Sequence, residues 1–217
     1  MGEGYPDSKS RGRSPWGVLA LVMLTGIALM KDGVDVSLGP PQPAAAASLG
    51  RTAGETFAPL VPPKSMDFAP AERIRVPALS IDAPIMDVGL DADGWIEAPP
   101  AKDPNIAGWY QNGIAPGQRG TSVVVGHVDN RSGPAVFYGL GSVRRGDRIE
   151  VPRFDGSEAV FEVYGVEVFA KNDFPAAQVY GDTGHAELRV ITCGGGYSKA
   201  DGYEANVVVF ARLVKAG

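Results

Sequence analysis

The stretch LRVITCGGGY, residues 188–197, contains the only cysteine of the chain, Cys193. An apolar, β-branched run leads into this cysteine and predicts a buried strand, and three glycines follow it. Free cysteine is among the most buried residue types, so an inert thiol in the core is one interpretation. The glycines favour another, because they remove side-chain cover and leave backbone N–H groups free to face a ligand. The stretch therefore indicates a thiol placed where the chain leaves a sheet.

A second apolar run, SVVVGHVD at residues 122–129, ends in the same way at His127. Side chains at strand ends on a rigid scaffold gain access to substrate. A nucleophilic thiol needs a general acid or base nearby in space, which can be distant in sequence. A lone histidine at a strand end is also often a structural residue. We predict that Cys193 and His127 act together, provided that their strands meet in the fold.

The region around these two runs is rich in strand patterns and turn signals. Short β-branched and aromatic runs alternate with segments such as DADG, PGQRG and FDGS. About eight strands in this length favour an all-β, closed or nearly closed barrel. Helix is predicted only as a turn or two at residues 105–110 and 134–140. The clearest predicted strands are residues 73–76, 121–125, 147–151, 159–169, 187–193 and 206–213.

Composition excludes several classes of function. The formal net charge is -5 and the pI about 5.1, and no basic stripe is present, so nucleic acid is not an expected partner. A single cysteine cannot form an intramolecular disulfide, and two histidines make a histidine-rich zinc site improbable. Phosphate-binding glycine motifs and a DxDxDG calcium motif are absent from the sequence. We therefore expect neither a metal nor an organic cofactor.

The amino-terminal part of the chain has a different composition. Residues 16–30, WGVLALVMLTGIALM, carry no charge and follow three basic residues, an asymmetry that places the amino terminus in the cytoplasm. As a helix the run covers about 23 Å, against a hydrocarbon core of about 30 Å. We predict a retained signal-anchor; a signal peptide cleaved near residues 44–47 is the alternative, and both export the domain. The predicted organisation is a cytoplasmic tail (1–14), a transmembrane segment (15–31), a Pro/Ala-rich flexible linker (32–70) and a catalytic domain (71–217).

The two strand-end motifs, taken together and in this order, resemble those of sortases, the membrane-anchored cysteine transpeptidases of Gram-positive bacteria. VVVGHVDNRSGPAVFYGLGSVRRGDRIEV is similar to the histidine segment of the family, and ELRVITCGG is similar to its TLxTC segment. The phrases GWYQNGIAPGQRG, FPAAQVYGDTG and NVVVFARL look most like the actinobacterial class F group.

This resemblance implies an eight-stranded sortase β-barrel outside a single-pass anchor in the cell membrane. It implies cleavage of an LPxTG-like sorting signal between Thr and Gly, with Cys193 as nucleophile and His127 as acid and base. A peptidoglycan precursor amine would then resolve the thioacyl-enzyme, and no cofactor is required. Thr192 and Gly194, which flank the cysteine, are expected to contact the substrate.

One departure from the family pattern concerns a third catalytic residue. Sortases generally carry an arginine at the start of the last strand, and this chain has Asn206 near that position. Asn206 is the first candidate, as a neutral donor to the oxyanion. Arg189, on the strand of the cysteine, is the second, as a substrate-binding residue, and Arg212 the third.

Two alternative functions stay open at the level of sequence. One is another cell-wall cysteine transpeptidase, of the L,D-transpeptidase type, although the SHGC-like motif of that class is absent from this chain. The other is an exported binding module on a sortase barrel that has lost catalysis together with the arginine.

Overall fold

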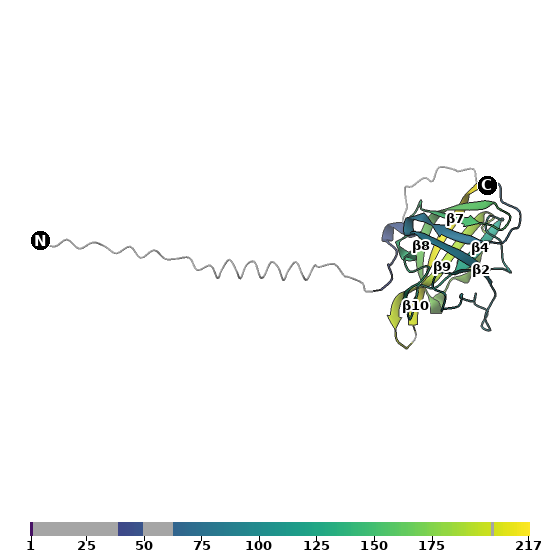
Figure 1. The fold of residues 1–217 in the computed structure, drawn as a ribbon. Helices are drawn as coiled ribbons and strands as arrows, with labels where there is room; N and C mark the ends of the chain where they lie inside the picture. The colour runs from purple at the N-terminus through teal and green to yellow at the C-terminus, as the bar shows by residue number, and fades with distance from the viewer. Residues whose placement is uncertain (2–38, 50–62, 201) are drawn as a thin grey trace. The chain divides into compact units, whose positions relative to one another are not determined.

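The computed structural model describes residues 1, 39–49, 63–200 and 202–217. Eight strands form a closed barrel in the order β1-β2-β3-β4-β9-β10-β8-β7 (Figure 1). This arrangement confirms the prediction of an all-β, eight-stranded barrel. The barrel strands are β1 (Arg73–Val76), β2 (Ile81–Val88), β3 (Ala107–Tyr110), β4 (Gly120–Val125), β7 (Arg148–Pro152), β8 (Glu158–Ala170), β9 (Ala186–Ser198) and β10 (Gly202–Ala216).

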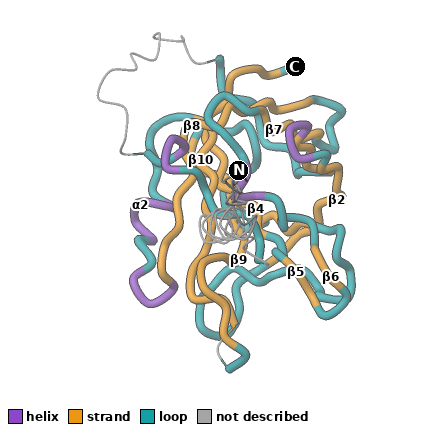
Figure 2. The backbone as a smooth tube through the Cα atoms, turned by 90° about the vertical axis from the view of Figure 1, so that its left-hand side faces the viewer, coloured by secondary structure: helices purple, strands orange, loops and turns teal. Residues whose placement is uncertain are grey.

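The remaining elements are short. A two-stranded sheet follows β4, and one α-helix occurs in the described part of the chain (Figure 2). These elements are β5 (Asp129–Asn130), β6 (Gly133–Pro134), α2 (Ala176–Tyr180) and the 3-10 turns η1 (Ala45–Ala47), η2 (Pro77–Leu79), η3 (Leu140–Ser142) and η4 (Lys171–Asp173).

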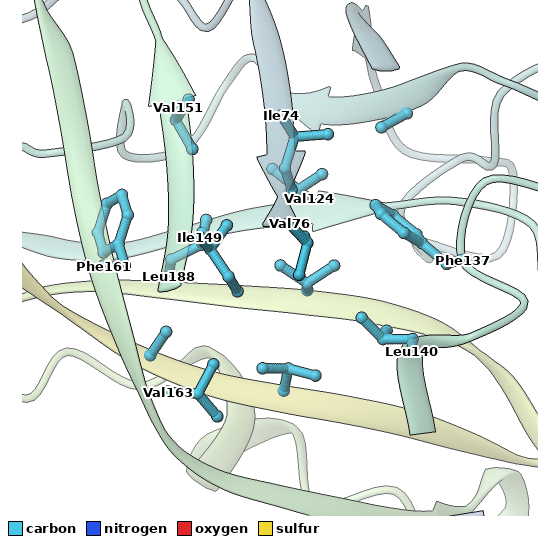
Figure 3. Close-up of a cluster of buried hydrophobic side chains, with 14 of the residues drawn as sticks. Ile74, Val76, Val124, Phe137, Leu140, Ile149, Val151, Phe161, Val163 and Leu188 are labelled. Carbon is cyan, nitrogen blue, oxygen red and sulfur yellow. The ribbon is translucent and has the colours of Figure 1, made fainter. Parts of the chain in front are cut away.

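The main hydrophobic core gathers side chains from all eight barrel strands. Figure 3 shows part of it, with labelled residues from β1, β4, β7, β8 and β9. Successive side chains of a strand point to opposite faces, so alternate β-branched residues supply this core. Ile74, Val76, Val124, Phe161 and Leu188 are completely buried in it. Burying each such side chain stabilises the fold by about 1.5–3 kcal/mol.

A second apolar cluster lies on the other face of the sheet formed by β4, β9 and β10. Its buried members from those strands alternate in sequence with members of the main core, as Val123 does with Val124. Val179 of α2 joins this second cluster and is completely buried. The short helix therefore packs against the outer face of the strands that carry the two strand-end motifs.

The predicted positions of the short helices were wrong. Within residues 105–110, Ala107–Tyr110 is strand β3, parallel to β2 with Ile85 opposite Ala107. Within residues 134–140, Pro134 belongs to β6 and only Leu140 begins a 3-10 turn. Tertiary pairing overrides local preference in segments this short, and the α-helix occurs at Ala176–Tyr180 instead.

Two described parts of the predicted linker contact the barrel. The Ser48 hydroxyl donates a 2.7 Å hydrogen bond to Oε1 of Glu167 on β8, and the backbone N–H of Leu49 donates to the same oxygen. The N–H of Met66 donates to the carbonyl of Gly117 at 2.8 Å. Most of residues 1–38, including the predicted anchor at 15–31, lies outside the described residues, so the domain boundaries stay a prediction. Where the chain is described, none of its helices has the length and apolar character needed to cross a bilayer.

Candidate active site

The floor of the site is formed by two adjacent parallel strands, at the point where their pairing with each other ends. Strand β4 ends at Val125, whereas β9 continues past Cys193 to Ser198, so the prediction that the thiol lies where the chain leaves the sheet was wrong. Strands β4 and β9 pair in register up to Val125 and Ile191. Continuing this register by two residues brings His127 opposite Cys193. Both residues lie two positions beyond a matched pair, so they share the face of Val125 and Ile191. The sheet topology thus unites two residues that are 66 positions apart in sequence.

Hydrogen bonds join the two strand ends directly before the functional residues. The Thr192 hydroxyl donates to the carbonyl of Gly126 at 2.8 Å, and the N–H of Gly126 donates to the carbonyl of Ile191 at 3.1 Å. Thr192 is buried, and Gly126 has no room for a side chain because a Cβ would lie 2.5 Å from the Phe137 ring. Thr192 does line the predicted cleft, but its hydroxyl is engaged in holding β9 to β4.

A cavity of about 600 Å³ opens over these strand ends, and both Cys193 and His127 line it. Both residues are half-buried, so the thiol is not sealed in the core. The other walls of the cavity are mostly apolar and include Ile96, Ala98 and Tyr180. A concave, largely apolar cavity with a few convergent polar groups is the usual form of a site that binds a small segment of substrate.

The carbonyl of Pro99 sets the orientation of the His127 ring, because it lies 2.7 Å from Nε2. A carbonyl oxygen can only accept a hydrogen bond, so Nε2 must carry a hydrogen in this contact. In the neutral ring, Nδ1 is then the nitrogen that can take up a proton. Pro99 thereby selects one tautomer and leaves the other nitrogen for acid–base chemistry.

Strand β10 brings Asn206 beside the thiol, since Asn206 is the register partner of Cys193. Asn206 lines the cavity, as expected for the first candidate for the third residue. Gly194 follows the cysteine and is buried against Val207, where a Cβ would approach to 2.5 Å. Gly195 has a φ of 76°, which favours glycine, so the turn away from the thiol depends on this residue.

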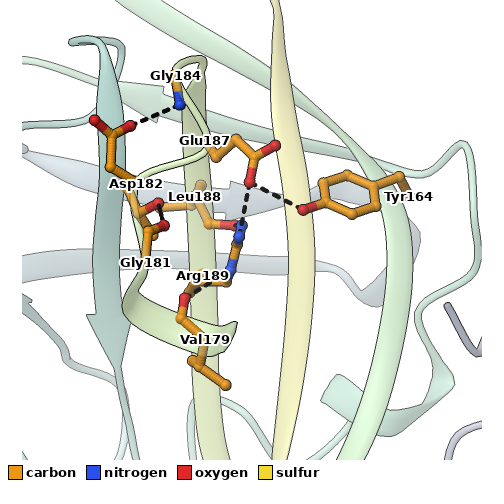
Figure 4. Close-up of polar contacts among 9 residues, drawn as sticks. Tyr164, Val179, Gly181, Asp182, Gly184, Glu187, Leu188 and Arg189 are labelled. Atoms are coloured by element: carbon orange, nitrogen blue, oxygen red, sulfur yellow. Dashed lines mark hydrogen bonds and ion pairs between the residues drawn. The ribbon is translucent and has the colours of Figure 1, made fainter. Parts of the chain in front are cut away.

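Arg189 does not line the cavity, and its predicted role in substrate binding is not supported. Its guanidinium is almost completely buried, with Nη2 2.7 Å from Oε2 of Glu187 and Nε donating to the carbonyl of Val179 at 3.0 Å (Figure 4). The hydroxyl of Tyr164 donates to the same Glu187 oxygen at 2.9 Å. Burial raises the pKa of Tyr164, which keeps this hydroxyl a donor. Arg189 therefore anchors helix α2 through Val179.

Arg212, the third candidate, lies at the other end of β10. The register partner of Arg212 on β9 is Glu187, whereas the register partner of Asn206 is Cys193. The Arg212 guanidinium is 3.9 Å from the Glu162 carboxylate. Arg212 is six positions beyond Asn206, a separation of roughly 20 Å along the strand. Arg212 is therefore remote from the thiol.

Sequence reasoning missed the walls of the cavity, which come from two loops. One loop joins β2 to β3 and contributes Trp95 and Ile96; the other joins β8 to β9 and contributes Lys171 and Tyr180. Among the described residues that line the cavity, Lys171 is the only lysine or arginine. One sequence signal was available for it: Lys171 follows the predicted strand 159–169, which pairs with the strand of Asn206.

A further contact joins the start of β10 to the segment that follows His127. The hydroxyl of Tyr203, in the β9–β10 hairpin, donates to Oδ2 of Asp129 at 2.5 Å. Asp129 is two residues beyond His127, and Tyr203 is three residues before Asn206. Burial, together with the Asp129 carboxylate, raises the pKa of Tyr203, so its hydroxyl remains a donor at neutral pH.

Within residues 39–49, 63–200 and 202–217, no group of three histidine, cysteine, aspartate or glutamate side chains is arranged to hold a metal ion. The polar groups of the cavity are instead a thiol, an imidazole, side-chain amides, a hydroxyl and an ammonium. This set suits covalent acyl transfer, which needs a nucleophile, a proton carrier and donors for an oxyanion.

Comparison with known proteins connects this geometry to a family. The family model of the sortase domain matches residues 74–214. The fold is similar to that of the SrtA sortase from Actinomyces oris, with 21% identity, a TM-score of 0.53 and coverage of 72% of this chain and 87% of that one. Sortase A from Listeria monocytogenes gives 19% identity, a TM-score of 0.51 and coverage of 69% and 90%.

A lid mutant of sortase A from Corynebacterium diphtheriae gives 19% identity, a TM-score of 0.52 and coverage of 69% of this chain and 73% of that one. At these identities the structural likeness concerns the fold. No curated protein sequence matches the chain.

Proposed function

The chain belongs to the sortase family of cysteine transpeptidases, and from this premise we propose that it cleaves an LPxTG-like sorting signal between threonine and glycine. The acyl part of the cleaved protein is then transferred to an amine of a peptidoglycan precursor. The observation that carries the proposal is that Cys193, within β9, and His127, two residues beyond the end of the adjacent parallel strand β4, line one cavity.

The first half-reaction forms a thioester on Cys193. The thiol proton passes to Nδ1 of His127, and the sulfur attacks the threonine carbonyl carbon. The carbonyl oxygen becomes an oxyanion, for which Asn206 is the nearest candidate side-chain donor because it is the register partner of Cys193. When the carbonyl re-forms, the C–N bond to glycine breaks, and the glycine nitrogen takes its proton from His127.

The second half-reaction reverses the roles. The incoming amine attacks the thioester carbon, His127 accepts a proton from that amine, and the C–S bond breaks. The sulfur leaves as a thiolate and regains its proton from His127, so the enzyme returns to its starting state. The Pro99 carbonyl keeps the same ring nitrogen available in both directions, because it holds Nε2 throughout.

A neutral amide in place of an arginine weakens the stabilisation of the oxyanion. An uncharged donor contributes less than a charged one, so we propose a slower acylation than an arginine would support. The absence of the arginine charge is also the reason for the alternative function, a non-catalytic binding module. Membership of the sortase family removes the other alternative, an L,D-transpeptidase.

Three finer assignments form part of the proposal. The class F subgroup is supported by the phrases GWYQNGIAPGQRG, FPAAQVYGDTG and NVVVFARL. A single-pass membrane location is supported by the uncharged run at residues 16–30 and the basic residues before it. An extracytoplasmic domain follows from the same charge asymmetry, and it would place the cavity where surface proteins and cell-wall amines meet.

The test uses the full chain with an LPxTG-type peptide and an amine acceptor. We expect mass spectrometry to detect a thioester on Cys193 and transfer to the amine. Cys193→Ala should abolish both, and His127→Ala should lower the rate by about 10² to 10⁴-fold. His185→Ala is the matched control, because His185 is the only other histidine and does not line the cavity.

Retention of wild-type transpeptidation by both the Cys193 and His127 variants would overturn the proposed mechanism. Peptide binding by the unmodified protein without any thioester would instead support the binding module.

A further inference from the structure

A second, smaller cavity of about 320 Å³ adjoins the active-site cavity. Trp95, Ile96 and Tyr180 line both cavities, so the two are continuous along one wall. The other lining residues of the second cavity include Tyr110 and Val123. None of the described residues around it is charged. Its chemistry is therefore that of a receptor for an apolar side chain.

Strand β4 shows where the second cavity lies relative to the thiol. Its residue Val125 lines the first cavity, whereas Val123 and Thr121 line the second. The second cavity thus begins four residues before His127, at a distance of roughly 13 Å along the strand. The two cavities therefore succeed each other along β4, and the second lies farther from Cys193 than the first.

The acyl half of the substrate is the half that this floor must hold. During the reaction the acyl part stays bound to Cys193 as a thioester, whereas the amine part departs. The four motif residues on the acyl side, from leucine to threonine, span at most about 14 Å when fully extended. They can fill the first cavity, and the chain that precedes the motif then reaches the second.

The walls of the second cavity are held in place without a substrate. The Thr121 hydroxyl on the floor donates to the carbonyl of Gly181 at 2.8 Å, directly after α2, and Arg189 anchors Val179 of the same helix. On the opposite side, the Trp95 ring contacts the Phe174 ring edge-on, with centroids 6.1 Å apart. Both loops are therefore braced, so the cavity is preformed.

The rim of the cavity presents apolar surface to solvent. Leu90 is 47% exposed and Trp95 is 49% exposed, and both line the cavity. Contiguous exposed apolar residues beside a groove are typical of a binding surface. Their position, continuous with the active-site cleft, indicates the substrate as the occupant.

Resting on the proposed function, we infer that this cavity binds an apolar side chain of the substrate on the amino-terminal side of the sorting motif. The side chain belongs to the fifth or sixth residue before the scissile bond. The enzyme then selects surface proteins by the apolar character of the segment that precedes their motif, in addition to the motif itself.

The test compares two peptides that share one sorting motif and differ only before it, with leucine or serine at both the fifth and the sixth position. On the full chain we expect kcat/KM to be about tenfold higher for the leucine peptide, chiefly through a lower KM. Binding to the Cys193→Ala variant, followed by fluorescence anisotropy, should show the same preference without any chemistry.

Substitutions at the rim test whether the preference for the leucine peptide arises at the second cavity. Leu90→Ser should reduce the ratio between the two peptides by about threefold, whereas Leu90→Met should keep it. Phe154→Ser is the matched control, because Phe154 is 68% exposed and lines neither cavity.

Equal binding of the two peptides by the Cys193→Ala variant, or a preference unchanged by Leu90→Ser, would overturn the inference. Failure of the proposed function is a separate result: the leucine peptide would bind preferentially and form no thioester on the unmodified chain.

Discussion

Arg189 and Cys193 lie on the same face of strand β9, four residues apart, and have opposite environments. The Arg189 guanidinium is sealed beneath helix α2 and paired with Glu187, whereas the Cys193 thiol is half-buried and lines an open cavity. Both residues pair with β10, whereas β4 pairs with β9 only as far as Ile191. The cover differs as well: α2 packs over Arg189 through Val179, whereas the thiol faces the cavity. The buried Arg189 charge holds α2 and Glu187 in place, and the accessible Cys193 thiol is available for the proposed reaction.

Removing the buried Arg189–Glu187 ion pair should have the largest effect on stability. Arg189→Met leaves the Glu187 carboxylate buried without its cation, so we expect a loss of about 3–5 kcal/mol in the free energy of unfolding. Urea denaturation measures this loss. The double variant Arg189→Met with Glu187→Leu should recover most of it, because a buried ion pair can be replaced by apolar side chains at little cost. A double variant as unstable as the single one would contradict this account.

Thr192 lies between Arg189 and Cys193 on β9. Thr192→Val removes the hydrogen bond to Gly126 and leaves a buried carbonyl without this donor, at a cost of about 1–3 kcal/mol. Because the bond also holds the strand end beside His127, kcat should fall by roughly tenfold. Thr192→Ser keeps the hydroxyl and should preserve both quantities. A Val variant with unchanged kcat would show that the strand ends stay aligned without this bond.

The Tyr203–Asp129 hydrogen bond offers a milder test of the open end. Tyr203→Phe removes the hydrogen bond between the start of β10 and the segment after His127, so we expect kcat to fall about fivefold with little change in KM, and stability to fall by about 1 kcal/mol. Tyr197→Phe is a close control, because the Tyr197 ring contacts the Tyr203 ring edge-on with centroids 5.1 Å apart, and its hydroxyl makes no hydrogen bond to a residue that the structure describes. Equal effects of the two variants would assign the result to the hairpin in general.

Lys171 should give the smallest effect. Lys171→Met removes the only lysine or arginine among the described residues of the cavity. Two unit charges about 7 Å apart in water interact by about 0.6 kcal/mol, which sets the scale of the expected effect on a thiolate. We therefore expect kcat/KM to fall about threefold at low salt, and the difference to shrink at 0.5 M salt. Lys171→Arg should retain the activity, and Lys215→Met, near the far end of β10, should have no effect. A salt-independent loss would point to packing instead of charge.

The strand pattern of the sequence predicted much of the barrel. Six strands were placed within a few residues, because their β-branched runs are bounded by turn residues. Strand β2 was missed because Pro84 interrupts its pattern, and β3 because its four residues, AGWY, include no β-branched side chain and were interpreted as helix. Both depend on a parallel pairing between segments that no local signal announces.

The sequence predicted the residues on the floor of the candidate site and did not predict those of its walls. His127 follows β4, and Cys193 and Asn206 lie within the paired stretches of β9 and β10, so the predicted strands place all three near their observed positions. Trp95, Ile96 and Tyr180 belong to loops whose course depends on packing against distant residues. Arg189 shows the same limit in another way, because the sequence places it on the correct face of β9 and does not reveal the helix that covers it.

By itself, then, the sequence determined a β-barrel with a thiol at the end of one apolar run and an imidazole at the end of another, because strand periodicity and turn chemistry are local properties. Only the tertiary structure decided that these ends are neighbours, that Pro99 orients the ring, and that the apolar floor continues into a second cavity. The physical reason is that strand order, register and cover depend on contacts between residues far apart in the chain, which form only when the whole barrel closes.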